Sequence, residues 1–304
     1  MFQRRSTKRK PVPWSTKDES KFLKLLEEEK CGIATLRSIF PERSDASLRA
    51  KRRKLKIREN IFGERYRAVK SEFTAEIAAR IRPRMIFEAY AGIGHQTRVW
   101  LDHCDHLVCA ELNPAKCKIL VKNLISDGYK KCNGFNHHWV SLKNHNKTVD
   151  VFQGDALRAA TEIAVFVGGA DVLDLDTCGS TIPTITTFVN LLHPKHMLIT
   201  HGEFHSLRFG REDVLKRLMC HKSIAQEILP LTVNGLALEL DRAVKVSCLR
   251  AHNETKDSYF PELVGECWLG EPQSGMLRRY YKIEKAIATA DSINRIVSDK
   301  DKCQ

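Results

Sequence analysis

The sequence predicts an α/β fold, a doubly wound sheet with helices on both faces, preceded by a small all-α domain. Three observations predict it. From Met85 onward, apolar strand-like runs alternate with amphipathic helical runs, which is the order typical of parallel sheets. A Gly-x-Gly turn at Gly92 and Gly94 directly follows the first of these runs. Residues 1–70 hold 21 Lys and Arg against 9 Asp and Glu, so +12 of the net charge of +13 lies there.

The composition is that of a globular intracellular protein. Hydrophobic residues make up 42% of the chain, enough for the core of one α/β domain. The sequence shows no signal-peptide pattern and no apolar run of about 18 residues, so we expect no membrane partner. The ten cysteines include no Cys-x-x-Cys pair. We therefore expect reduced thiols and an intracellular location, nuclear in a eukaryote and otherwise cytoplasmic.

The chain divides into segments of different composition. The expected organisation is a disordered basic tail (1–13), a three-helix domain (14–58), a helical connector (59–83), the α/β domain (84–290) and a C-terminal tail (291–304). The three histidines and Cys132 within residues 128–147 form no recognised zinc spacing, so no metal site is expected. The oligomeric state does not follow from the sequence.

The basic N-terminal domain is expected to bind a polyanion. Its first helix has Ser15 or Thr16 as a cap, and its third helix, over 46–57, has Ser44 or Asp45. The third helix carries most of the cations, as a helix that enters a groove of nucleic acid does. The cations expected to contact nucleic acid are Arg43, Arg49, Lys51, Arg52, Arg53, Lys54 and Lys56, and those of the third helix are expected to form its outer surface.

This domain resembles a single Myb/SANT-like repeat over residues 13–57. The resemblance lies in the Trp14 start, the Phe40-Pro41 turn and the basic run that begins at Ser47. It implies a helix-turn-helix that binds DNA or RNA. A charged, solvated helix or a SANT module that contacts protein is the alternative.

The elements of the α/β domain follow from their periodicity. We expect strands over 85–89, 106–110, 149–153, 171–175 and 196–200, and helices over 95–103, 115–126, 157–167 and 213–221. Residues 128–147 are polar and indicate an insertion or a long loop. Two later strands are expected over 236–240 and 243–249, as a hairpin around Asp241 and Arg242. The segment from Gly265 onward carries little functional signal.

The turn after the first strand suits a nucleotide-like ligand. Glycine at 92 and 94 lets the backbone approach such a ligand without a Cβ clash. Glu111 ends the second strand 17 residues after Gly94, where an acid can accept hydrogen bonds from both hydroxyls of a ribose. The third glycine of a dinucleotide fingerprint is absent, which favours S-adenosylmethionine (SAM), a ligand without a pyrophosphate.

These two runs resemble motifs I and II of class I SAM-dependent methyltransferases, which have a Rossmann-like sheet. The resemblance implies that SAM is the cofactor. The residues expected to bind it are Glu88, Ala91, Gly92, Gly94, Glu111, Asp155 and Asp174. A plain Rossmann-like scaffold is the alternative.

The segment from Asp171 to Ser180 carries the candidate chemistry. Asp174 and Asp176 come at the end of the fourth strand, the edge at which such sheets place reacting groups. The run resembles the Asp-x-Asp-Pro-aromatic-Gly motif of the tRNA guanine-N2 (di)methyltransferase family. The resemblance implies that Asp176 is catalytic, that Asp155 accepts from the adenine amine, and that the target is an exocyclic amine of a tRNA guanosine.

The sequence departs from that motif because Thr177 and Cys178 replace Pro-aromatic. Candidates for the missing aromatic are Phe188, Phe204 and Phe209. Cys178 is a second catalytic candidate, as the nucleophile of cytosine-C5 chemistry, but it can equally be a structural or a substrate-lining thiol. The alternative functions are a DNA methyltransferase and a DNA-binding regulator with a degenerate methyltransferase fold. After the fifth strand, His201 and Glu203 either touch substrate or are surface polar residues.

Overall fold

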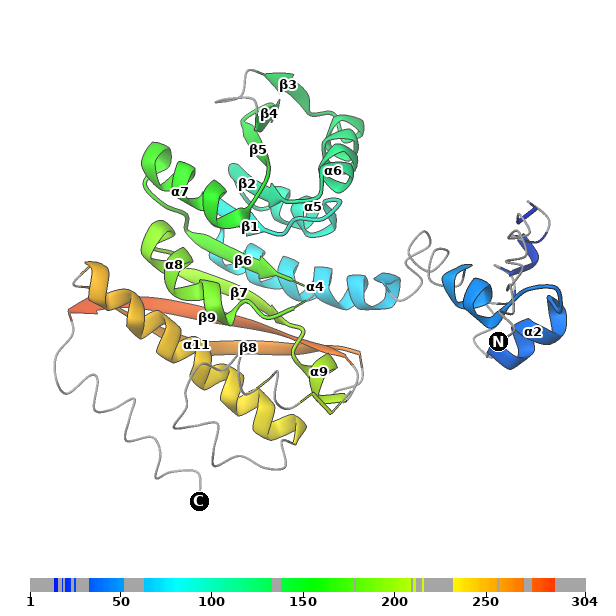
Figure 1. The fold of residues 1–304 in the computed structure, drawn as a ribbon. Helices are drawn as coiled ribbons and strands as arrows, with labels where there is room; N and C mark the ends of the chain where they lie inside the picture. The colour runs from blue at the N-terminus through cyan, green and yellow to red at the C-terminus, as the bar shows by residue number, and fades with distance from the viewer. Residues whose placement is uncertain are drawn as a thin grey trace, which may run out of the picture. The chain divides into compact units, whose positions relative to one another are not determined.

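A computed structural model gives the fold of the chain (Figure 1). It describes residues 14–15, 18, 20–22, 25, 33–51, 63–132, 138–177, 179–208, 210–211, 215, 232–255, 257–270 and 275–287. The chain forms two compact units, Met1–Arg65 and Tyr66–Gln304. Among the described helices, none has the length and apolarity that a membrane crossing requires.

In the second unit, the described strands form one nine-stranded sheet of order β3-β4-β5-β2-β1-β6-β7-β9-β8. Its centre is parallel, and an antiparallel pair extends each edge. The strands are β1 (Met85–Ala89), β2 (His106–Glu111), β3 (Lys130–Cys132), β4 (Trp139–Asn144), β5 (Lys147–Gln153), β6 (Val172–Asp176), β7 (His196–His201), β8 (Asp257–Leu269) and β9 (Met276–Ile287). All five predicted strands from 85 to 200 are confirmed to within two residues at either end.

Helices cover both faces of this sheet (Figure 1). On one face lie α7 (Ala156–Val167), α8 (Ile182–Leu192) and α11 (Val233–Thr255). On the other lie α4 (Gly63–Ile81), α5 (His95–Leu101) and α6 (Pro114–Ser126). The short helix α9 is Phe204–Arg208. The predicted Rossmann-like α/β class is therefore confirmed.

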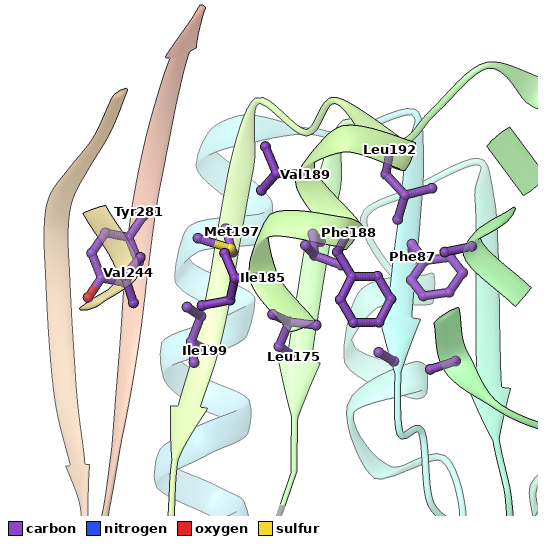
Figure 2. Packing of buried hydrophobic residues seen from close by; sticks show 14 of the residues in the cluster. Phe87, Leu175, Ile185, Phe188, Val189, Leu192, Met197, Ile199, Val244 and Tyr281 are labelled. Atoms are coloured by element: carbon purple, nitrogen blue, oxygen red, sulfur yellow. The ribbon is translucent and has the colours of Figure 1, made fainter. Parts of the chain in front are cut away.

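The main core lies between the sheet and the helices α7, α8 and α11. Alternate strand residues point to one face, so Phe87, Leu175 and Met197 meet the apolar side of α8 (Figure 2). Phe87 and Phe188 have ring centroids 6.0 Å apart. Removing this apolar surface from water is the main contribution to the stability of the unit.

One expectation about the later strands was wrong. The segments 236–240 and 243–249 belong to the single helix α11 rather than to a hairpin. The buried positions Leu236, Leu240, Val244 and Cys248 repeat every four residues, which is helical spacing, and Asp241 pairs with Lys245 at i,i+4. Residues 128–147, expected to be an insertion or a long loop, include the strands β3 and β4, which is consistent with an insertion.

Part of the other expectations falls outside the described residues. The helix expected over 213–221 lies there, Leu215 excepted, and so do the tails 1–13 and 291–304. The helical character of the connector is confirmed for α4, which covers 63–81.

The first unit has a small aromatic and aliphatic core. Its buried members are Phe22, Leu36, Phe40 and Leu48, with Trp14 packed against them. The helix α2 (Ile33–Ile39) contributes Leu36, and residues 45–51 are helical. The predicted caps are found: the Asp18 amide donates to Ser15 Oγ (3.1 Å) and the Ser47 amide to Ser44 Oγ (3.2 Å).

Candidate active site

The candidate site lies where the strand order of the sheet reverses. β1 pairs with β2 on one side and with β6 on the other, and Ala89 stands beside both Ala110 and Leu175. The loops that follow these strands therefore leave the same edge. Ligands of open α/β sheets bind at such a switch point, so the tertiary structure brings together the three segments that the sequence singled out.

The loop between β1 and α5 has an unusual backbone. Tyr90, Gly92 and Gly94 all have left-handed φ values of 67°, 62° and 90°. A Cβ at position 94 would lie 2.4 Å from Leu120 Cδ1, so glycine there allows α5 to lie close to α6. A Cβ at position 92 would have no heavy atom within 4 Å. The loop is therefore open at Gly92 and closely packed at Gly94.

Glu111 ties this loop to the end of β2. Its carboxylate accepts hydrogen bonds from the Gly92 amide at 2.8 Å and from the Asn113 amide at 2.7 Å. The Ala91 amide also donates to the Ala110 carbonyl, at 3.0 Å. These bonds fix the position of the loop relative to β2.

Asp155 follows β5 and caps α7. Its Oδ1 accepts from the amides of Leu157 and Arg158, at 2.9 and 3.2 Å, and the residue is exposed. A capping carboxylate stabilises the first turn of a helix. A role of Asp155 in binding adenine stays a prediction.

Glu88 and Asp174 are buried, and their expected contact with the cofactor stays a prediction. Glu88 is 1% exposed and accepts from Thr97 Oγ1 at 2.6 Å. Burial, and next to it the charge of Asp174, raise the pKa of Glu88 to about 8. Asp174 is fully buried and accepts from Trp100 Nε1 at 2.7 Å. Both side chains accept hydrogen bonds from α5 and so link the helix to the strands β1 and β6.

Asp176 is the carboxylate that remains accessible at the end of β6. Its side chain is 22% exposed and forms an ion pair with Lys70 of α4, whose side chain is 12% exposed. Burial alone would raise the pKa of Asp176, but Lys70 and Arg278 outweigh it and hold the pKa below its usual value. The predicted catalytic residue is therefore ionised at neutral pH and held by a cation.

Sequence reasoning missed Lys70 and Arg278. Lys70 is 106 positions from Asp176 in the chain, on a helix interpreted only as a connector. Arg278 of β9 is fully buried and donates to Asp174 at 2.8 Å and to Thr200 Oγ1 at 2.9 Å. The available signal was the Arg278-Arg279 pair among the large side chains of this strand, because a buried arginine requires a partner.

The aromatic candidates are largely excluded. Phe188 is buried against Phe87, and Phe204 is 1% exposed with its ring 4.8 Å from that of Trp268. Neither can stack on a base in this arrangement. Phe209 lies outside the described residues.

Cys178 also lies outside the described residues, so its role stays a prediction. Of the residues on either side of it, Thr177 Oγ1 donates to the Gly179 carbonyl at 2.8 Å.

His201 and Glu203 are not surface residues. They are 0% and 3% exposed, with His201 Nδ1 3.6 Å from Glu203 Oε2. The expectation of surface polar residues is wrong, because His201 is the last residue of β7 and pairs with Leu277 of β9, and Glu203 is buried directly after it.

The predicted nucleic-acid-binding residues of the first unit fall into two groups. Arg43 and Lys51 are each 6% exposed and lie over the ring of Trp14, at 4.4 and 5.1 Å from its centroid. The expectation that Lys51 faces outward is wrong, because the indole face attracts the cation and covers it. Arg49 is exposed. The remaining cations, Arg52, Arg53, Lys54 and Lys56, lie outside the described residues.

No protein-family model and no curated protein matches the sequence. Solved structures do. One is Trm1 from Pyrococcus horikoshii in complex with S-adenosyl-L-methionine, with a TM-score of 0.57, 12% identity, 71% of this chain and 54% of that chain covered. The chain thus spans about half the length of Trm1. This likeness confirms the fold. The chain has a Rossmann-like methyltransferase fold.

Two further structures were matched at lower TM-scores. Trm5b from Pyrococcus abyssi has a TM-score of 0.44 and 10% identity, over 72% of this chain and 49% of that one. An O-methyltransferase from Bacillus cereus, in complex with SAH, has a TM-score of 0.44 and 12% identity, over 70% and 80%.

Proposed function

We propose that the chain is a SAM-dependent methyltransferase that acts on an exocyclic base amine of a nucleic acid, with a tRNA guanosine as the favoured target. One observation carries the proposal: Glu111, the glycine loop and an ion-paired Asp176 meet at the carboxyl ends of three adjacent strands. The fold shared with Trm1 and the motif around Asp176 support it.

The residues of the loop fit SAM in two respects. The backbone at Gly92 is open on the side where a Cβ would project. Glu111 is held by two backbone amides and keeps lone pairs that can accept from ribose hydroxyls. When bound, SAM supplies an electrophilic methyl group.

Asp176 would position the acceptor. An ionised, partly exposed carboxylate accepts a hydrogen bond from an amine N–H and thereby orients the nitrogen lone pair. A neutral exocyclic amine is nucleophilic enough only when it is well aligned, so orientation is the main contribution that this residue would make.

In the same proposal, the first unit is a Myb-like module that binds the nucleic acid. Its small core around Trp14 and the exposed Arg49 support this role. The burial of Arg43 and Lys51 assigns these two cations to the Trp14 core instead.

The test is incubation of the full chain with labelled SAM and separate pools of tRNA, rRNA and DNA, followed by nucleoside mass spectrometry. We expect an N2-methylated guanosine from the tRNA pool. Asp176→Ala should abolish its formation while SAM affinity changes little, and the exposed Asp102→Ala should retain activity.

Other products would point elsewhere. A methylated deoxynucleoside would indicate a DNA methyltransferase. A covalent adduct between Cys178 and a 5-fluorocytosine substrate would indicate cysteine chemistry. If the protein does not bind SAM even at millimolar concentration, the remaining hypothesis is a DNA-binding regulator with a degenerate methyltransferase fold.

A further inference from the structure

The ion pair between Lys70 and Asp176 joins a helix before the sheet to the candidate catalytic strand end. Lys70 Nζ donates to Asp176 Oδ2, and Lys70 is 12% exposed. One turn further along α4, Thr74 is fully buried and accepts from Arg278 at 3.2 Å. The helix α4 therefore lies against the end of the sheet through two polar contacts, and Lys70 makes the outer one.

The other titratable groups near Asp176 have partners of their own. Arg278 of β9 is bound by Asp174, Thr200 and Thr74. Glu88 of β1 is bound by Thr97 and Cys109 of neighbouring elements. The charge of Lys70 also acts on two other titratable groups, His95 of α5 and Cys267 of β8, and favours a lower pKa at each. Among the described residues, Lys70 is thus the cation that forms an ion pair with Asp176.

We propose that Lys70 is a positioning residue for Asp176. It holds one carboxylate oxygen in place and keeps the group ionised, so that the exposed part of the carboxylate stays ready to accept from the acceptor amine. This inference rests on the proposed methyltransferase function. An ammonium group is suited to this role because its positive charge stabilises a neighbouring carboxylate. It is compact and sits on a long, flexible stem, so it can bind one carboxylate oxygen and leave the other accessible.

The burial of the pair makes the effect large. A carboxylate that loses its partner while it remains largely buried is destabilised in its charged form, so it binds a proton more tightly. Removing the ammonium group should therefore raise the pKa of Asp176. Arg278 moderates the rise because its charge remains nearby.

The first measurement needs no substrate. The full chain is labelled with ¹³C at the aspartate side-chain carboxyl, and the Asp176 signal is assigned by its loss in Asp176→Asn. We expect the titration midpoint of Asp176 to rise in Lys70→Gln and to stay low in Lys70→Arg, which keeps the charge. Lys118→Gln, which removes an exposed cation of α6, is the matched control.

The second measurement is the pH profile of kcat on whichever polymer pool the unaltered protein methylates. Lys70→Gln should lower kcat by about 100-fold and move the acidic limb of the profile to higher pH, with SAM affinity measured by calorimetry little changed. A purely structural role would lower the amount of folded protein without moving the limb. Lys70→Arg should recover most of the lost rate.

The outcomes separate the two proposals. Without SAM binding or methylation by the unaltered protein, the proposed function fails, and the inference fails with it. With methylation intact, an Asp176 midpoint and an acidic limb that do not move in Lys70→Gln would overturn the role of Lys70 alone. If Lys70→Gln does not fold, the test uses Lys70→Arg. A titration midpoint of Asp176 in that variant that is at or above the ordinary pKa of an aspartate would refute the inference.

Discussion

The buried carboxyl group of Glu88 gives the sharpest quantitative prediction. Its side chain lies beneath the glycine loop, 1% exposed, and its pKa is raised from 4.5 to about 8. In the unfolded chain the group loses its proton near pH 4.5, whereas in the folded protein it keeps the proton until about pH 8. The unfolded state therefore binds fewer protons between these values, and the stability contributed by this residue falls as the pH rises through that window.

The magnitude follows from the two pKa values. Each unit of difference corresponds to about 1.36 kcal/mol, so Glu88 should reduce the free energy of unfolding by roughly 3.5 kcal/mol between pH 5 and pH 8. Glu88→Gln removes the ionisation but keeps an oxygen that can accept from Thr97. The variant should be close to the unaltered protein in stability at pH 5 and more stable by that amount at pH 8.

The assay is urea unfolding followed by tryptophan fluorescence at pH 5, 6, 7 and 8. Trp14→Phe in both proteins confines the signal to the three tryptophans of the second unit. Histidines that also titrate in this window cancel in the difference between the two proteins. The exposed Glu76→Gln is the control, because water already solvates that carboxylate. A stability difference that stays the same from pH 5 to pH 8 would refute the assignment of a buried, protonated Glu88.

Three further predictions concern ligand binding and packing. Glu111→Ala should weaken SAM binding by roughly 1–3 kcal/mol, because the ribose hydroxyls lose their proposed acceptor and the Gly92 amide loses the bond that holds the loop. Calorimetry measures it, and unchanged affinity would argue against the cofactor site. Gly94→Ala should destabilise the second unit by about 1–3 kcal/mol, since its Cβ would meet a buried leucine of α6. Gly92→Ala should destabilise less but reduce SAM affinity, and thermal unfolding with calorimetry separates the pair. Arg49→Gln should flatten the log–log salt dependence of nucleic-acid binding by about 0.9, the value for one lost phosphate contact, whereas Lys118→Gln should leave the slope unchanged; equal slopes in filter binding would contradict the groove-facing helix.

The sequence by itself determined the parallel part of the sheet and the positions of its main functional loops. Strands that are buried on both faces are continuous apolar runs, so β1 and β2 could be located almost to the residue. Gly92, Gly94 and Glu111 were identifiable because their roles depend on local backbone geometry and on the strand ends that carry them. The caps at Ser15 and Ser44 were likewise local.

Only the tertiary structure decided which polar residues are buried and which meet. Lys70 and Asp176 come together across 106 positions. Arg278 reaches Asp174 from β9, an antiparallel strand whose pairing with β7 no local pattern encodes. The helix α11 was misread because its apolar residues also fit a strand pattern over short windows, and the full four-residue repeat is evident only once one face is known to be buried. The burial of Glu88, and with it the high pKa, follows from packing between α5 and the sheet. Local sequence thus fixes the backbone of the site, whereas its electrostatics depend on contacts between residues far apart in the chain.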